Sequence, residues 1–188
     1  MFESSEELID PYKTPMKTAV CTLACLLTSF IAPAFSEEAE STLVKVGETA
    51  PSFTVTTTEG SEVSTDKLKG KVILVNFFAT WCGPCLAELP HLETEIWQKL
   101  KDRGLAVVVI GREHSNEELA AFKASKKFTV PIAADPKREI YGKYATQYIP
   151  RNFVIGRDGK VIYQSMGFDQ AEFKQMIAKI EAELAKAE

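Results

Sequence analysis

The hydrophobic positions of this chain alternate between strand-like and helix-like patterns. Residues 71–78 and 105–110 are short and almost wholly apolar, with many β-branched side chains, as in strands that are buried on both faces. Between them, apolar residues recur every three or four positions from residue 86 to residue 100. That spacing predicts a helix over residues 82–101, with a kink at Pro90. The chain therefore runs from a buried strand into a helix and back into a buried strand.

Two hairpins are predicted on either side of this region. Residues 54–58 and 62–64 surround a Glu-Gly turn, and residues 151–155 and 161–165 surround an Asp-Gly turn. An Asp-Gly pair between apolar runs is a strong hairpin signal, because both residues tolerate the backbone angles of a tight turn. A further short extended piece is expected at residues 130–133.

Three more helices are indicated by their capping residues. Residues 115–127 begin with a Ser and a Glu three positions later, which is a capping box. Residues 136–145 begin with a proline, which is favoured in the first turn of a helix. Asp169 caps the last helix, whose apolar residues form one face. These elements predict an α/β fold with a mixed central sheet flanked by helices on both sides.

The first 36 residues differ in composition from the rest of the chain. Residues 18–34 are almost uncharged and mostly apolar, follow a lysine and end in small residues, which indicates a secretory signal peptide. Residues 1–15 are acidic and fit no such signal, so we expect translation to start at Met16. The alternatives are an uncleaved membrane anchor, although the apolar stretch is short for a spanning helix, and a lipoprotein. The lipoprotein is less favoured, because the residue three positions before the cysteine is not aliphatic.

The remainder of the chain forms a single domain. Residues 37–43 are a short polar linker, and residues 44–188 are long enough to bury a hydrophobic core of their own. The net charge is −4 and no Lys/Arg cluster is interleaved with aromatic residues, which argues against nucleic acid as a partner. His91 and His114 are too few for a histidine-rich metal site, and we expect both at the surface. No metal and no cofactor are expected.

The chain has 4 cysteines, and only one pair belongs to the predicted domain. Cys21 and Cys25 lie in the leader, so the exported domain keeps Cys82 and Cys85 alone. Closing so short a loop constrains the unfolded chain very little, which argues against a purely structural disulfide. A zinc site usually needs four ligands, and there is no second cysteine pair.

The segment Trp81-Cys82-Gly83-Pro84-Cys85 lies where the first buried strand ends and the helix begins. A thiol at this junction faces unpaired backbone N–H groups and the positive end of the helix dipole, which favour the thiolate. Thiolate is the form that attacks disulfides. We therefore interpret Cys82, at the helix start, as the nucleophile and Cys85 as the thiol that resolves the mixed disulfide.

Motifs around this pair extend the pattern over residues 44–180. They are Gly47-x-x-Ala50-Pro51-x-Phe53, Leu68-Lys69-Gly70-Lys71-Val72, Asn76 to Pro90 with Glu88, Tyr144 to Pro150, and Phe153-Val154-Ile155-x-x-Asp158-Gly159-Lys160. With these motifs the chain resembles the exported TlpA/ResA-like thiol–disulfide oxidoreductases of the thioredoxin superfamily. The resemblance implies a thioredoxin-like fold with an N-terminal β-hairpin extension.

The resemblance also implies a role for Glu88. Thioredoxins carry a buried Asp six residues before the first cysteine, where this chain has Asn76. Because an asparagine amide takes up no proton at neutral pH, the family pattern assigns the acid–base role to Glu88. Glu88 lies about one helical turn after Cys85, and burial there would raise its pKa. A surface glutamate on an amphipathic helix is the alternative.

Substrate contacts are implied on both sides of the cysteine pair. The resemblance implies a cis bond before Pro150, which would expose the Ile149 backbone to an extended substrate peptide. Trp81 is interpreted as an apolar contact for substrate, with packing as the alternative. Gly83-Pro84 resembles the dipeptide of reducing thioredoxins, whose potential is ~−270 mV, compared with ~−120 mV for the oxidant DsbA. Arg151 stands where the family usually has Thr. It is interpreted either as a cation near the sulfurs that favours thiolate or acidic substrates, or as a solvated loop residue.

These observations predict an enzyme that reduces disulfides of protein substrates in the periplasm or another extracytoplasmic compartment. Cytochrome c maturation is the process that the resemblance implies, with a membrane-bound electron donor and, if the leader is retained, a membrane tether. A disulfide donor working in the opposite direction is the first alternative. A copper-handling or protein-binding module is a weaker one, because the cysteine spacing and the histidines do not suit it.

Overall fold

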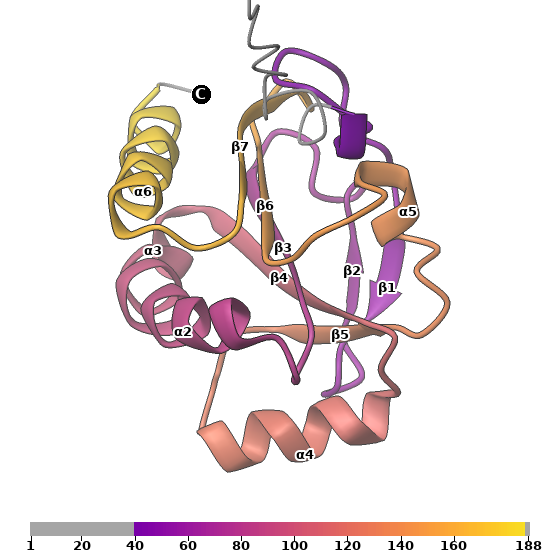
Figure 1. The fold of residues 1–188 in the computed structure, drawn as a ribbon. Coiled ribbons are helices and arrows are strands. Elements are labelled where there is room, and N and C mark those ends of the chain that lie inside the picture. The colour runs from indigo at the N-terminus through magenta and orange to yellow at the C-terminus, as the bar shows by residue number, and fades with distance from the viewer. Residues whose placement is uncertain (1–39, 187–188) are drawn as a thin grey trace, which may run out of the picture. The chain divides into compact units, whose positions relative to one another are not determined.

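A five-stranded mixed sheet forms the centre of the domain in the computed structural model, which describes residues 40–186 (Figure 1). The strand order is β5-β4-β3-β6-β7, and a separate two-stranded sheet pairs β1 with β2. The strands are β1 (Thr54–Thr56), β2 (Glu62–Ser64), β3 (Val72–Phe78), β4 (Leu105–Arg112), β5 (Ile132–Asp135), β6 (Arg151–Ile155) and β7 (Val161–Met166). The predicted mixed sheet and the N-terminal hairpin extension are both confirmed.

Strand β3 occupies the middle of the sheet, and every residue of it is buried. It runs parallel to β4 and antiparallel to β6, so both of its edges are paired. Its burial on both faces explains why its sequence is apolar at every position except Asn76, because such a strand has no side that faces solvent. Strand β5 begins and ends two residues later than the extended piece expected at 130–133.

Helical segments connect and cover these strands. They are α2 (Gly83–His91), the π-helical segment η1 (Leu92–Trp97), α3 (Gln98–Leu100), the short 3-10 turn η2 (Lys101–Arg103), α4 (Asn116–Lys126), α5 (Tyr141–Tyr144) and α6 (Gln170–Leu184). The capping box of α4 and the Asp169 cap of α6 are present as predicted. In α6, Phe173, Met176 and Ile180 form the buried face.

Two hydrophobic cores lie on opposite faces of the sheet. Val72 and Leu74 of β3 pack in one core with residues of α2, α3 and α6, which lie on the same side in Figure 1. Ile73 and Val75 face the other core, which α5 and the β1–β2 hairpin cover. The alternation along β3 therefore divides the domain into a helical face and a face closed by a short helix and a hairpin.

The long helix expected over residues 82–101 differs in detail. Its first part, α2, ends one residue after Pro90, and the chain continues in the wider π-helical turns of η1. Proline has no N–H to donate to the carbonyl four residues earlier, so the regular ladder is interrupted at this point. The Gln98 N–H then bonds the Glu93 carbonyl, five residues back.

The helix expected over residues 136–145 was wrong in length, because only Tyr141–Tyr144 are helical. Arg138 has a left-handed backbone with a φ of 59°, which a continuous α-helix does not allow. The Asp135 carboxylate also accepts the N–H groups of Ile140 and Tyr141, so it caps a helix that starts later.

The leader lies outside the described residues, as do Met16, Cys21, Cys25 and the first part of the linker, so the expectations for them stay predictions. Within residues 40–186, no helix is long and apolar enough to cross a membrane.

Candidate active site

The two cysteines meet at the N-terminus of α2, where they form a disulfide. Cys82 is the N-cap residue, and its Sγ accepts a hydrogen bond from the Cys85 backbone N–H at 3.3 Å. Cys82 is 6% exposed, and Cys85 is 0% exposed. A backbone donor and a helix N-terminus at one sulfur stabilise negative charge on it once the pair is reduced. Cys82 is therefore the more accessible cysteine of the pair, as expected from the sequence.

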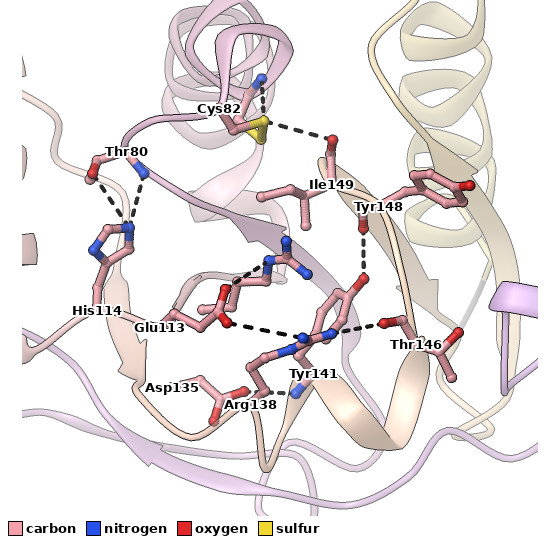
Figure 2. Close-up of polar contacts among 12 residues, drawn as sticks. Thr80, Cys82, Glu113, His114, Asp135, Arg138, Tyr141, Thr146, Tyr148 and Ile149 are labelled. Carbon is pink, nitrogen blue, oxygen red and sulfur yellow. Dashed lines mark hydrogen bonds and ion pairs between the residues drawn. A yellow bond between two sulfur atoms is a disulfide. The ribbon is translucent and has the colours of Figure 1, made fainter.

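A loop before β6 faces this sulfur. The Ile149–Pro150 bond is cis, as the resemblance implied, and the Ile149 carbonyl oxygen lies 3.7 Å from Cys82 Sγ (Figure 2). In the reduced protein a Cys82 thiol can donate to this oxygen. Trp81, directly before Cys82, is 63% exposed, which excludes a role in core packing, and Tyr148, directly before Ile149, is 42% exposed. Each of the two loops at the cysteine pair thus carries an aromatic side chain at the surface.

Glu88 is buried on the same helix, three residues after Cys85. It is 1% exposed, and its carboxylate accepts one hydrogen bond from the Asn76 amide at 2.9 Å and one from the Asn152 amide at 2.6 Å. Burial raises its pKa from 4.5 to about 7, against the opposing effect of the Asn152 and Asn76 hydrogen bonds. The surface alternative is excluded, and the carboxyl group can exchange a proton near neutral pH.

Asn152 completes this buried polar cluster and was not identified from the sequence. It lies directly opposite Asn76 in the β3–β6 register, and its Oδ1 accepts a hydrogen bond from the Asn76 amide at 2.8 Å. Its own amide also lies 3.2 Å from Ser165 Oγ on β7. The signal in the sequence was an asparagine followed by the apolar residues of a predicted strand. A buried asparagine at such a position needs hydrogen-bond partners, so its presence indicates a second polar group nearby.

One amide oxygen of this cluster receives no hydrogen bond from residues 40–186. Asn76 Oδ1 is buried and accepts no hydrogen bond from the described residues. Rotating the Asn76 amide by 180° would exchange the positions of its NH₂ donor and this Oδ1 acceptor. The Asn76 side chain can therefore donate to Glu88 as a carboxylate or accept from Glu88 as a carboxylic acid.

His114 was expected at the surface, and this was wrong. Its side chain is buried after the end of β4, and its Nε2 accepts the Thr80 backbone N–H at 3.1 Å (Figure 2). Thr80 lies two residues before Cys82, so His114 fixes the approach of the chain to the cysteine pair. Because the carboxyl ends of parallel strands meet at one edge of a sheet, the position of His114 after β4 was the signal for this contact.

The interpretation of Arg151 as a solvated loop residue was also wrong. Its side chain is buried, and its guanidinium donates to the Gln147 carbonyl at 3.1 Å and to the hydroxyl groups of Ser41 and Thr42. It fastens the start of the domain to the loop that leads into β6. Because these contacts are buried, the Arg151 side chain is not solvated, and it has a structural role.

The site holds the groups needed for thiol–disulfide exchange. Among residues 40–186, no cluster of three or more His, Cys, Asp or Glu side chains is placed to hold a metal ion. The chemistry available is that of a sulfur nucleophile with a backbone donor, a second thiol within the same helical turn, and a buried carboxyl group with a pKa near neutrality.

Comparisons with known proteins agree with this geometry. A profile of the Redoxin family matches residues 45–184 of the chain. The thiol-disulfide oxidoreductase ResA of Bacillus thuringiensis is 33% identical over 124 residues, which cover 66% of this chain and 71% of ResA. A solution structure from Bacteroides thetaiotaomicron, described as a candidate protein disulfide isomerase, is 37% identical with a TM-score of 0.75 and covers 78% of this chain and 94% of its own.

A thiol:disulfide interchange protein of the thioredoxin family from Chlorobium tepidum has the same architecture. It is 27% identical with a TM-score of 0.63, and the match covers 76% of this chain and 99% of that one. These likenesses confirm the thioredoxin-like fold that the sequence predicted.

Proposed function

Because this chain belongs to the Redoxin family and is a thiol–disulfide oxidoreductase, we propose that it acts as an exported reductant of protein disulfides. The observation that carries the proposal is the cysteine pair itself. Cys82 lies at a helix N-terminus opposite the Ile149 backbone, and a buried Glu88 lies on the same helix. The reducing direction is supported by Gly83-Pro84, which resembles the dipeptide of reducing thioredoxins.

The first step is attack by the Cys82 thiolate on a substrate disulfide. A bond forms between Cys82 Sγ and one substrate sulfur, and the other substrate sulfur leaves as a thiolate. The Cys85 thiolate then attacks Cys82 Sγ and displaces the first substrate sulfur. Two electrons pass from the dithiol to the substrate, and the protein is left with the Cys82–Cys85 disulfide seen in the structure.

Glu88 takes part through the proton of Cys85. A carboxylate with a pKa of about 7 can accept this proton during resolution and return it when the pair is reduced again. Asn76 and Asn152 hold the carboxylate through one amide donor each, so the group remains in place in its charged form.

Export is proposed from the apolar leader segment of the sequence. The protein would act in the periplasm or another extracytoplasmic compartment, where a membrane-bound donor must supply electrons because the surroundings are oxidising. From the family resemblance, we propose cysteine-containing envelope proteins, including those of cytochrome c maturation, as substrates. Retention of the leader would tether the enzyme to the membrane.

Insulin reduction by the purified protein with dithiothreitol tests the activity. The wild-type protein should speed precipitation of the insulin B chain, and Cys82→Ser should abolish the effect because the nucleophile is lost. Cys85→Ser is the matched control. It keeps the nucleophile but cannot resolve, so a mixed disulfide on Cys82 should accumulate and be visible by mass spectrometry. Full activity of Cys82→Ser would refute the mechanism.

A further inference from the structure

One buried side chain, Tyr141, contacts the loop that faces Cys82 and is connected through Arg112 to Trp81, the residue before Cys82. Its hydroxyl group donates a hydrogen bond to the Tyr148 carbonyl at 2.7 Å, and Tyr148 precedes the Ile149 carbonyl that faces Cys82 (Figure 2). On the other side, the Arg112 guanidinium lies 5.0 Å from the Tyr141 ring centroid and 5.7 Å from the Trp81 ring centroid. Arg112 therefore links the Tyr141 ring to the aromatic residue next to Cys82.

Tyr141 is itself held rigidly from several directions. The Asp135 carboxylate at the end of β5 accepts its backbone N–H at 2.8 Å, and its ring packs edge-on against Phe77 of β3 with centroids 5.3 Å apart. Arg138 lies 5.0 Å from the same ring and donates to the Thr146 carbonyl at 2.8 Å (Figure 2). A side chain fixed in this way can transmit its position to the loop that it contacts.

The hydrogen bond from Tyr141 supports an unusual backbone conformation at Tyr148. Tyr148 has a φ of 67°, in the left-handed region that tyrosine rarely adopts. A residue stays in this region only where its surroundings determine it, and the Tyr141 hydroxyl supplies a direct contact to its carbonyl.

We propose that Tyr141 is a positioning residue that sets the Tyr148–Ile149 backbone opposite Cys82 and thereby favours polypeptide substrates over small ones. The inference rests on the proposed function only in that Cys82 forms a mixed disulfide with its substrate. An extended peptide bound to Cys82 runs alongside the Ile149 backbone and pairs with it as a strand edge. A small thiol has no backbone to pair, so its mixed disulfide is indifferent to the position of this loop.

Tyr144 offers a matched control on the same helix. Its ring is buried in the same core, and its hydroxyl group donates to the Pro51 carbonyl, also at 2.7 Å. Tyr141→Phe and Tyr144→Phe each remove one buried hydroxyl group that donates to a backbone carbonyl, and both keep the ring. The Tyr141 hydroxyl group also interacts with the buried side chain of Arg151, the residue directly after the same loop. Only the Tyr141 hydroxyl contacts the loop next to Cys82.

The experiment measures a disulfide exchange equilibrium on Cys82. The full chain carries Cys21→Ser, Cys25→Ser and Cys85→Ser, so that Cys82 is its only thiol and a mixed disulfide on it persists. This parent is used alone or together with either phenylalanine substitution. A nine-residue unstructured peptide with a central cysteine competes with 2-mercaptoethanol: the incoming thiolate bonds to Cys82 Sγ, and the other thiol leaves. Mass spectrometry gives the ratio of the two mixed disulfides, and thermal denaturation verifies that both variants are folded.

The preference for the peptide should fall about three- to tenfold in Tyr141→Phe, the effect of losing one net hydrogen bond. It should stay within about twofold of the parent in Tyr144→Phe, whose lost hydrogen bond lies elsewhere. Equal preferences in both variants would overturn the role of Tyr141. The equilibrium does not depend on whether the enzyme reduces or oxidises its substrate, so a failure of the proposed direction would show separately, in the insulin assay.

Discussion

Glu88 is an acidic residue whose surroundings push its pKa in opposite directions. Burial raises the pKa, the Asn152 and Asn76 amides lower it, and burial prevails, because the pKa rises from 4.5 to about 7. The difference corresponds to about 3 kcal/mol between the two protonation states. The protein therefore retains a carboxyl group that destabilises its fold at neutral pH, as expected of a group kept for its chemistry.

This destabilisation predicts a pH dependence that Glu88→Gln removes. Because the pKa of Glu88 is raised in the folded state, its carboxyl group does not lower the free energy of unfolding below pH 4.5. The free energy of unfolding falls as the pH rises from 4.5 to about 7, and the whole loss is present above that. The free energy of unfolding of Glu88→Gln minus that of the wild type should therefore rise by about 3 kcal/mol between pH 4 and pH 8.

Urea denaturation of the oxidised proteins across this range measures the difference. Comparing the two proteins cancels the titration of all other groups, and amide mispairing in the variant adds only a constant offset. A difference that does not change with pH would show that Glu88 ionises in the folded protein as it does in water.

The cysteine pair could be predicted from the sequence because its two residues lie in one helical turn, and the family resemblance pointed to Glu88 on the same helix. Asn152 and His114 could not be predicted. Asn152 reaches Glu88 only through the β3–β6 register, and His114 reaches Thr80 only through the pairing of β3 with β4. Contacts between such distant residues depend on strand register, which apolar patterns alone do not specify.

At the scale of elements, the π-helical segment η1 has a clear structural function. Glu93 lies at its start and is buried, and its carboxylate accepts the backbone N–H groups of Thr129 and Val130 at 3.0 and 2.9 Å. Burial raises the pKa of Glu93, but hydrogen bonds from Thr129, Gln98 and Val130 outweigh it, so the pKa is lowered overall. The segment thus anchors the loop that leads into β5.

Glu93→Ala should destabilise the protein by about 3 kcal/mol, because two backbone donors lose a charged acceptor. Glu95→Ala, in the same segment, is the control. Glu95 pairs with His91 at a partly exposed position, and its loss should cost less than about 1 kcal/mol.

Chemical denaturation gives both values, and the rate of insulin reduction should be unchanged in either variant. Equal losses of stability for the two substitutions would contradict the anchoring role of Glu93.

Elements whose signals are local were predicted well. The two hairpins, the α4 capping box and the Asp169 cap depend on residues within a few positions of one another. The helix expected over residues 136–145 failed because its start is decided by Asp135 and by the left-handed Arg138. A sequence pattern that favours a helix does not show that hydrogen bonds to a nearby side chain make the helix begin at a later residue.

At the scale of the whole molecule, the sheet order assembles the site. The carboxyl ends of β3 and β4 bring the cysteine pair and His114 together, and β6 begins beside them with the Ile149–Pro150 loop. Apolar patterns predicted a mixed sheet, but they did not place β6 next to β3. The pairing of β6 with β3 comes from the structure.

The central claim is that the Cys82–Cys85 pair serves as a reductant. Its reduction potential, measured by equilibrating the purified protein in graded thiol/disulfide buffers, tests this most directly. We predict a value close to that of reducing thioredoxins, ~−270 mV, with Cys82→Ser showing no transition. A value near ~−120 mV, as in the oxidant DsbA, would contradict the account and make the protein a disulfide donor.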